Sequence, residues 1–178
     1  MKNQDADVGS LLMFDIYKIF DLPQNQFSIN LEDLEKKYID LQKKYHPDAA
    51  RTQLDKIDFV KKSADINSSF SILKNDYQRA SYILKTNNID IQGNEYRHYL
   101  DPKFMVDILE KSEILETLEG QDELLEFYGV LKSERKNLLE KISAFIESEF
   151  KSAALETIKL RYFDNLIEKT NNKLEKCF

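Results

Sequence analysis

Residues 30–48 of the chain read NLEDLEKKYIDLQKKYHPD, and this stretch predicts one amphipathic helix with a defined beginning and end. Asn30 is a good N-cap residue because its side chain can accept hydrogen bonds from the first free amides of a helix. Apolar side chains then recur at spacings of three and four, which predicts one buried stripe: Leu31, Leu34, Tyr38, Leu41 and Tyr45. Pro47 ends the helix, because it lacks an amide hydrogen and its ring clashes with the preceding turn.

A basic face lies on the opposite side of this helix. Four lysines cluster there, with Asp40 among them: Lys36, Lys37, Lys43 and Lys44. Because the whole chain has a formal net charge of −6, these lysines would give a local positive field that attracts a partner with a negative groove. A solvated helix face without a partner is the alternative, and the lysines alone do not decide between the two.

Further helices are expected in the N-terminal half. A short one over 12–20 is ended by Leu22-Pro23, since the residue before a proline avoids the helical conformation. A longer one follows the polar loop after Pro47 and spans about 58–75. Its inward side chains are expected to be Val60, Ala64, Asn67, Phe70 and Leu73. A last short segment covers about 76–84.

The C-terminal half predicts a helical bundle. From about 85 to 100 the apolar periodicity lapses into turn-rich sequence, which predicts a linker. Asp101-Pro102 then begins a helix, because it places an N-cap before a proline at the first helical position. Helices over about 101–118, 121–150 and 152–174 are joined by short turns and should pack as an antiparallel three-helix bundle. No segment shows strand alternation, so the predicted fold class is all-α.

Composition narrows the classes of function. The chain has 178 residues with only four Gly and three Pro, which favours helix. A pI of about 5.1 argues against a nucleic-acid partner. No apolar run approaches the roughly 20 residues that cross a bilayer, so no membrane segment is expected. Residues 1–12 show no export-signal pattern and are expected to form a disordered leader.

Residues that could hold a metal or perform catalysis are sparse. Cys177 is the only cysteine, and His46 and His98 lie far from it. No metal site and no cofactor are therefore expected, and a reducing compartment is favoured. There is no glycine-rich phosphate-binding loop and no motif that pairs Ser or Cys with a histidine. We expect no enzymatic activity.

Tyr45-His46-Pro47-Asp48 is the most informative motif. Two further motifs follow it along the chain, after the polar loop: Ile66-Asn67-x-x-Phe70-x-x-Leu73 and Gln78-Arg79-Ala80. Together with the lysine-face helix, they resemble a J-domain over residues 13–84. J-domains use the tripeptide and the lysine face to contact a DnaK-class chaperone and stimulate its ATP hydrolysis. The resemblance therefore implies a chaperone-binding site made of Lys36, Lys37, Tyr38, Lys43, Lys44, His46, Pro47 and Asp48.

The C-terminal half narrows this resemblance. It has no Gly/Phe-rich segment and no Cys-x-x-Cys module, and a linker over 85–100 leads to an acidic bundle over 101–178. Residues 101–116 and the run LRYFDNL at 160–166 are similar to the HscB family of co-chaperones in iron–sulfur cluster biogenesis. This similarity implies that the bundle binds the scaffold protein IscU and that the J-domain engages the specialised chaperone HscA. We expect a monomer in the bacterial cytoplasm.

The helix from Asp101 presents two apolar faces. One is expected to fill the bundle core: Phe104, Ile108, Leu115 and Leu118. The other is an apolar strip rimmed by acids, which is typical of a partner surface: Met105, Val106, Leu109, Glu110 and Glu113. Packing of the J-domain on this strip is the alternative. The family resemblance favours scaffold binding, since these five residues and Tyr162 match its scaffold-binding positions, although Thr117 stands where an acid is expected.

Two other hypotheses stay open. The chain could be a J-protein for a different client, which binding to an iron–sulfur scaffold would test. It could also be a plain helical adaptor in which the tripeptide is incidental, which chaperone ATPase stimulation would test.

Overall fold

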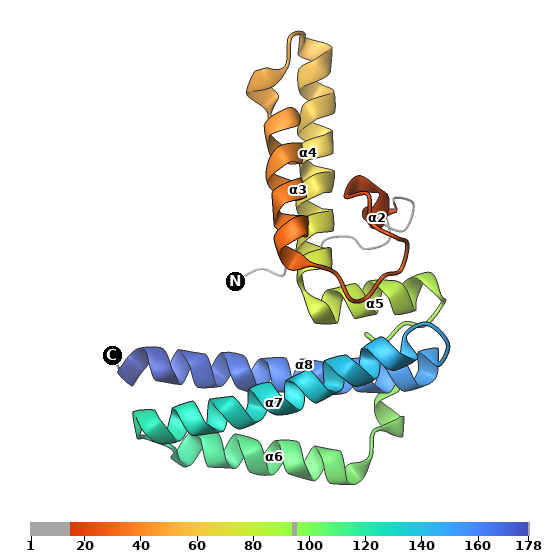
Figure 1. Ribbon diagram of the computed structural model, residues 1–178. Coiled ribbons are helices and arrows are strands. Elements are labelled where there is room, and N and C mark those ends of the chain that lie inside the picture. The colour runs from red at the N-terminus through yellow and green to blue at the C-terminus, as the bar shows by residue number, and fades with distance from the viewer. Residues whose placement is uncertain (1–14, 94–95, 178) are drawn as a thin grey trace. The chain divides into compact units, whose positions relative to one another are not determined.

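The computed structural model describes residues 15–93 and 96–177, and all regular secondary structure in these ranges is helical (Figure 1). The chain divides into two compact units, one ending at Tyr82 and the other beginning at Ile83. The predicted all-α class, a helical hairpin and a helical bundle, is confirmed. The predicted leader over 1–12 lies outside the described residues, and the predicted J-domain, linker and bundle limits stay predictions.

The N-terminal unit is built on a helical hairpin. Its elements are α2 (Ile16–Ile19), α3 (Leu31–Lys44), the 3₁₀ turn η1 (Pro47–Ala49), α4 (Gln53–Lys74) and the first part of α5 (Asp76–Thr86). In Figure 1, α3 and α4 run side by side in opposite directions. Of the short helix predicted over 12–20, the structure shows α2, and residues 12–14 lie outside the described ranges.

Local capping explains where these helices begin. Asn30 accepts hydrogen bonds from the amides of Glu32 and Asp33 at 3.0 and 3.3 Å, as its N-cap position requires. Thr52 and Asp55 form a capping box, in which each side chain accepts a hydrogen bond from the other's amide at 3.1 Å. Because of this box, α4 begins about one turn earlier than the apolar periodicity predicted.

The core of the N-terminal unit contains a buried arginine. Arg79 is 4% exposed. Its guanidinium donates to the carbonyl of Phe27 at 2.7 Å, to the carbonyl of Leu73, and to Asp76 Oδ1 at 2.5 Å. These partners compensate for the desolvation of the charge, which would otherwise be costly. Within the Gln78-Arg79-Ala80 motif, Arg79 therefore has a structural role.

The predicted inward face of α4 is partly wrong. The buried residues are Ile66, Ser69 and Leu73, whereas Val60, Ala64 and Asn67 are exposed. Of the five predicted residues, Leu73 is buried and Phe70 is half-buried. Towards its N-terminal end, α4 has α3 and the η1 turn beside it on one side in Figure 1, so apolar positions away from that side stay in solvent.

The C-terminal unit is a bundle of three long helices. After the 3₁₀ turn η2 (Tyr96–Tyr99) come α6 (Pro102–Thr117), α7 (Gln121–Phe145) and α8 (Phe150–Leu174), followed by η3 (Glu175–Cys177). Successive helices run antiparallel in Figure 1. Asp101 caps α6 by accepting from the amide of Lys103 at 2.9 Å, as predicted. Inward side chains of α7 fill the core, all of them at most 7% exposed: Leu124, Leu131, Leu138 and Ile142.

Polar contacts fix the packing of these helices. Arg135 on α7 pairs with Asp164 on α8 at 2.6 Å. The Lys173 ammonium, near the end of α8, donates to the carbonyls of Leu115 and Glu116 at 2.8 and 3.0 Å. It thus satisfies two of the free carbonyls at the C-terminus of α6 and complements the helix dipole there.

Candidate partner-binding surfaces

The predicted tripeptide lies between the two helices of the hairpin. His46 is the N-cap of η1, and its Nδ1 accepts a hydrogen bond from the amide of Asp48 at 3.2 Å. The side chains of His46 and Asp48 are 59% and 86% exposed. The turn is therefore ordered by its own hydrogen bonds, and both side chains are accessible to a partner.

Tyr45 ties this turn to α4. Its ring meets that of Phe59 edge-on, with 5.5 Å between centroids. The ammonium groups of Lys44 and Lys62 lie 5.3 and 5.0 Å from the centroid of the Tyr45 ring. The hydrogen bond from Lys62 to Asp58 raises the pKa of Lys62. The tripeptide thus follows Tyr45, which contacts residues of both α3 and α4. Sequence reasoning missed the contact between Tyr45 and Phe59, because it depends on how α3 and α4 pair.

Tyr38 lies at the seam between α3 and α4. Its ring stacks on Phe70, with 4.0 Å between centroids, and its hydroxyl donates to Asn67 Oδ1 at 2.9 Å. Gln42 donates to the same oxygen at 2.7 Å, and Ser63 donates to Gln42 at 3.3 Å. Tyr38 therefore joins the two helices, and its predicted chaperone-binding role stays a prediction.

The four predicted lysines differ in their surroundings. Lys37 is half-buried and donates to the carbonyls of Phe20 and Asp21 at 2.6 and 3.2 Å, which holds the end of α2 against α3. Lys36 is exposed and lies 3.5 Å from Asp33, a surface ion pair that contributes little to stability. These two lysines lie in the middle of α3, away from the tripeptide.

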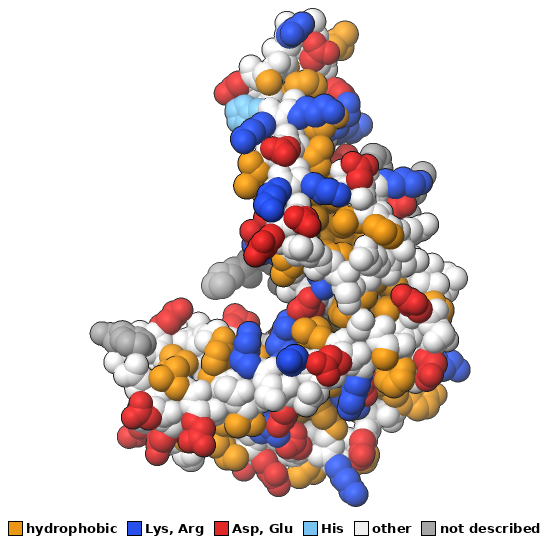
Figure 2. Space-filling view, in the orientation of Figure 1, with side chains coloured by type: hydrophobic (Ala, Val, Ile, Leu, Met, Phe, Trp, Pro, Cys, Tyr) orange, Lys and Arg blue, Asp and Glu red, His pale blue; other side chains and the backbone are white. Residues whose placement is uncertain are grey.

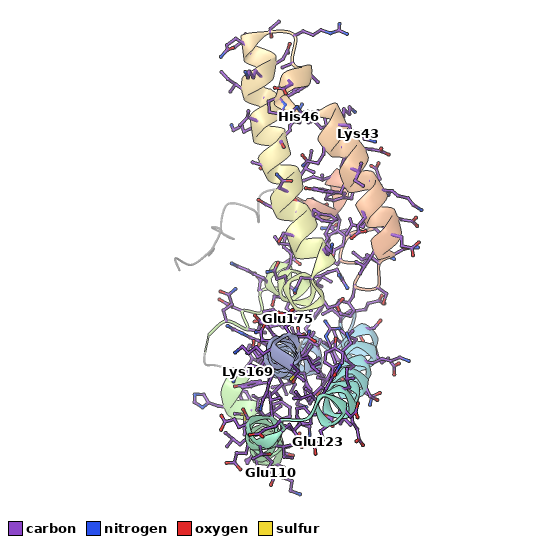
Figure 3. All side chains as sticks on the ribbon, turned by 90° about the vertical axis from the view of Figure 1, so that its left-hand side faces the viewer. Lys43, His46, Glu110, Glu123, Lys169 and Glu175 are labelled. Atoms are coloured by element: carbon purple, nitrogen blue, oxygen red, sulfur yellow. The ribbon has the colours of Figure 1, made fainter. Side chains whose placement is uncertain are left out.

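Lys43 and Lys44 occupy the last turn of α3 and are exposed. Figure 3 shows Lys43 and His46 at the same end of the hairpin. Cations are favoured at this position because the carbonyl end of a helix carries partial negative charge. Of the four lysines, this pair is therefore the best placed to contact a partner together with the tripeptide.

On the bundle, the structure leaves the predicted strip of α6 accessible. Val106 and Leu109 are 53% and 61% exposed. Met105 is half-buried, and Glu110 and Glu113 are exposed. Figure 3 shows Glu110 on the outer side of α6. We call these five residues, together with Tyr162, the bundle surface.

Tyr162 comes to α6 from the last helix. Its ring meets Phe104 edge-on, with 5.8 Å between centroids, and Phe104 also contacts Phe163 at 6.3 Å. Phe104 is therefore an aromatic contact between α6 and α8 and is half-buried, as is Leu118. Ile108 and Leu115 are buried as predicted, at 8% and 5% exposure.

The two units also differ in surface charge. Figure 2 shows acidic side chains gathered where α6 ends and α7 begins, whereas basic and acidic side chains are interspersed along the hairpin. The acids in this stretch are all exposed: Glu116, Glu119, Asp122, Glu123 and Glu126. Thr117, which stands where an acid was expected, donates its hydroxyl to the carbonyl of Ile114 at 2.8 Å.

Neither a metal site nor a membrane span is found in the described part of the chain. Within residues 15–93 and 96–177, no three His, Cys, Asp or Glu side chains are grouped so that they could hold a metal ion. No helix in these ranges is long and apolar enough to cross a bilayer.

Comparisons with known proteins cover both units. A family model described as the HSCB C-terminal oligomerisation domain matches residues 100–171. The co-chaperone protein HscB homolog of Aliivibrio salmonicida is 34% identical over 168 residues, covering 89% of this chain and 97% of the relative. The human iron-sulfur cluster co-chaperone protein HscB is 29% identical over 163 residues, covering 89% of this chain and 68% of that protein.

Solved structures of HscB proteins also match this chain. The crystal structure of human co-chaperone protein HscB matches with a TM-score of 0.81 at 28% identity, covering 89% of this chain and 81% of that chain. Chaperone HscB from Vibrio cholerae matches with a TM-score of 0.82 at 24% identity, covering 93% of this chain and 100% of that chain. At that lower identity, the second match is evidence for the fold alone.

Proposed function

The chain belongs to the HscB family of co-chaperones, and from this premise we propose that it stimulates the ATPase of a DnaK-class chaperone, HscA, and delivers the iron–sulfur scaffold protein IscU to it. The proposal assigns one partner to each unit. In this proposal the ATP is hydrolysed by the chaperone, and this chain contributes binding. We further propose that it acts as a monomer in the bacterial cytoplasm.

The observation that carries the chaperone half is the ordered, exposed turn at His46 and Asp48. The Nδ1 hydrogen bond and the Tyr45 contacts fix the turn before a partner arrives, so less conformational entropy is lost on binding. Lys43 and Lys44 are in place to meet a negative surface on the chaperone. Such complementarity raises the association rate more than it raises the affinity.

The scaffold half is supported by the accessible apolar strip of α6. Leu109 and Val106 stand more than half exposed between acidic neighbours. An apolar centre with a polar rim is the usual anatomy of a protein interface, and a few central anchors carry most of its binding energy. Thr117 supplies no charge to this rim, so we expect Glu110 and Glu113 to supply its negative charge.

The chaperone half is tested by His46→Gln in a steady-state ATPase assay of the cognate chaperone. We expect stimulation to be lost, while the circular dichroism spectrum and melting temperature stay close to those of the wild type, because the side chain is exposed. A matched control, Gln53→Ala, changes an exposed polar residue at the start of α4 and should leave stimulation unchanged. Full stimulation by the His46→Gln protein would contradict the proposal.

The identity of the client is tested separately by pull-down with the iron–sulfur scaffold. If the chain activates the chaperone but does not retain the scaffold, it serves a different client. If it retains the scaffold but does not activate the chaperone, it is a helical adaptor.

A further inference from the structure

The loop that carries the tripeptide spans residues 46–51 and is anchored at both of its ends. At its C-terminal end, the capping box of Thr52 and Asp55 fixes the start of α4. At its N-terminal end, Tyr45 is the C-cap of α3, and its amide donates to the last turn of that helix at 3.0 Å. The side chain of Tyr45 then links this end of the loop to α4.

Two residues of α4 contact the Tyr45 ring. Phe59 meets it edge-on, with 5.5 Å between centroids, and the Lys62 ammonium lies 5.0 Å from its centroid. These two residues are three positions apart, so they share one face of α4. Lys62 is itself held, because its ammonium is 2.8 Å from Asp58 Oδ2 one turn earlier on the same helix. Lys44, at 5.3 Å, directly precedes Tyr45 in the chain and therefore cannot link the ring to α4.

The hydrogen bonds of the loop itself are local. The Asp48 amide donates to His46 Nδ1 at 3.2 Å, and the amides of Ala49 and Ala50 donate to the carbonyls of His46 and Pro47 at 2.9 and 3.3 Å. These bonds shape a turn that lies against α4, but none of them reaches that helix. The aromatic contact at the end of α3 therefore helps to set where the turn lies on the hairpin.

We propose that Phe59 and Lys62 are positioning residues for the tripeptide, although neither belongs to the predicted chaperone-binding site. By holding the Tyr45 ring against α4, they limit the motion of the turn before a partner binds, so that less conformational entropy is lost on binding. The effect on ATPase stimulation rests on the chaperone half of the proposed function, whereas the order of the turn is a property of the free chain. The two can therefore be measured separately.

The first measurement is ¹⁵N relaxation of the free, full-length chain. Lys62→Met keeps a long side chain without the charge, and we expect it to lower the order parameters at the amides of His46, Asp48 and Ala49. Lys62→Arg keeps a cation beside the ring and should restore the wild-type values. Lys61→Met removes an exposed lysine from the same turn of α4 and, as the matched control, should leave them unchanged.

Phe59→Leu should also lower these order parameters, because it removes the aromatic edge while keeping an apolar side chain. Phe59 is half-buried, so Lys62→Met, at an exposed position, keeps the test decisive if Phe59→Leu does not fold. Wild-type order at the turn in Lys62→Met, or in a folded Phe59→Leu, would overturn the proposal whatever the chaperone does.

The second measurement is the concentration of this protein that gives half-maximal stimulation of the cognate chaperone's ATPase. Lys62→Met should raise it by about two- to fivefold, the range of an exposed cation–π contact, with the maximal rate unchanged. Phe59→Leu should raise it by about two- to tenfold, the range of an aromatic pair. Because both residues act through Tyr45, a double-mutant cycle should show that each effect disappears in a Tyr45→Leu background.

Two results of the ATPase measurement would also overturn the proposal: full additivity of Lys62→Met with Tyr45→Leu, or an equal effect of Lys61→Met. If the wild type does not stimulate the chaperone at all, the proposed function is wrong. The relaxation measurement then decides by itself whether Phe59 and Lys62 position the turn.

Discussion

Helices α4 and α8 have similar lengths but are held in different ways. Of the 22 residues of α4, three are buried, and of the 25 residues of α8, eleven are buried. The hairpin is joined by a few specific contacts along one seam, such as the stack of Tyr38 on Phe70 and the edge contact of Tyr45 with Phe59. The bundle is held by a core. Residues near the tip of the hairpin are therefore free to serve binding without contributing much to stability.

The largest expected difference between the two regions is in the free energy of unfolding. Leu131→Ala removes a fully buried side chain from α7 and should cost about 2–5 kcal/mol. Val60→Ala truncates an aliphatic residue of α4 that is 52% exposed, and should stay within about 0.5 kcal/mol. Urea denaturation followed by circular dichroism measures both. Equal losses would show that the hairpin depends on buried apolar contact as much as the bundle does.

On α6 of the bundle, variants on the exposed side and on the buried side should affect binding and stability separately. The double variant Met105→Ala/Leu109→Ala should weaken scaffold binding by about 2 kcal/mol or more, because central apolar anchors carry most of an interface's energy. Titration calorimetry measures this loss. The stability of the double variant should change little. Ile108→Ala, on the buried side of α6, is the control and should destabilise the fold instead.

The outcome that would contradict this assignment is specific. If Met105→Ala/Leu109→Ala unfolds as readily as Ile108→Ala, the strip is part of a packed interior. Its role as a partner surface would then be wrong.

A smaller effect is expected at the hairpin seam. Asn67→Ala removes the acceptor shared by Tyr38 and Gln42 and should destabilise the N-terminal unit by about 1 kcal/mol, since a typical hydrogen bond contributes about 0.5–1.5 kcal/mol net. Thermal unfolding detects the change. Ser71→Ala, an exposed substitution on the same helix, is the matched control. If Asn67→Ala and Ser71→Ala had the same melting temperature, the hydrogen bonds to Asn67 would not stabilise the hairpin.

The smallest effect should appear in an association rate. Lys43→Glu/Lys44→Glu should slow binding to the chaperone, measured by stopped flow, and the difference should shrink as salt rises, because the Debye length falls to about 8 Å near 0.15 M. Lys151→Glu/Lys169→Glu reverses two exposed lysines of the bundle as a control of equal charge. A slower rate that does not respond to salt would point to a damaged fold.

Much of the fold could be predicted because the ends of helices are determined by residues close in the sequence. Asn30, Pro47 and Asp101 mark three helix limits through capping and backbone constraints that involve only neighbouring residues. The start of α4 was also readable, since Thr52 and Asp55 have the spacing of a capping box, but the prediction relied on apolar periodicity instead. Periodicity fails along the N-terminal half of α4, where the apolar side chains Leu54, Ile57 and Val60 are exposed and buried positions begin only at Ile66.

The candidate site was predictable in its residue types and not in its contacts. His46 and Asp48 could be placed at a tip from the proline and the polar loop alone. The bond from Tyr38 to Asn67 joins residues 29 positions apart and depends on the register of two helices. The edge contact of Tyr45 with Phe59 depends on the same register. No local pattern in the sequence reports either feature.

The most direct test of the two-surface account is one steady-state ATPase measurement of the cognate chaperone. It compares the wild type, His46→Gln and Met105→Ala/Leu109→Ala, each with and without the iron–sulfur scaffold. The account predicts that the scaffold increases stimulation by the wild type, that His46→Gln gives no stimulation in either case, and that Met105→Ala/Leu109→Ala stimulates alone but gains nothing from the scaffold. Undiminished scaffold-dependent stimulation by Met105→Ala/Leu109→Ala, or any substantial stimulation by His46→Gln, would contradict it.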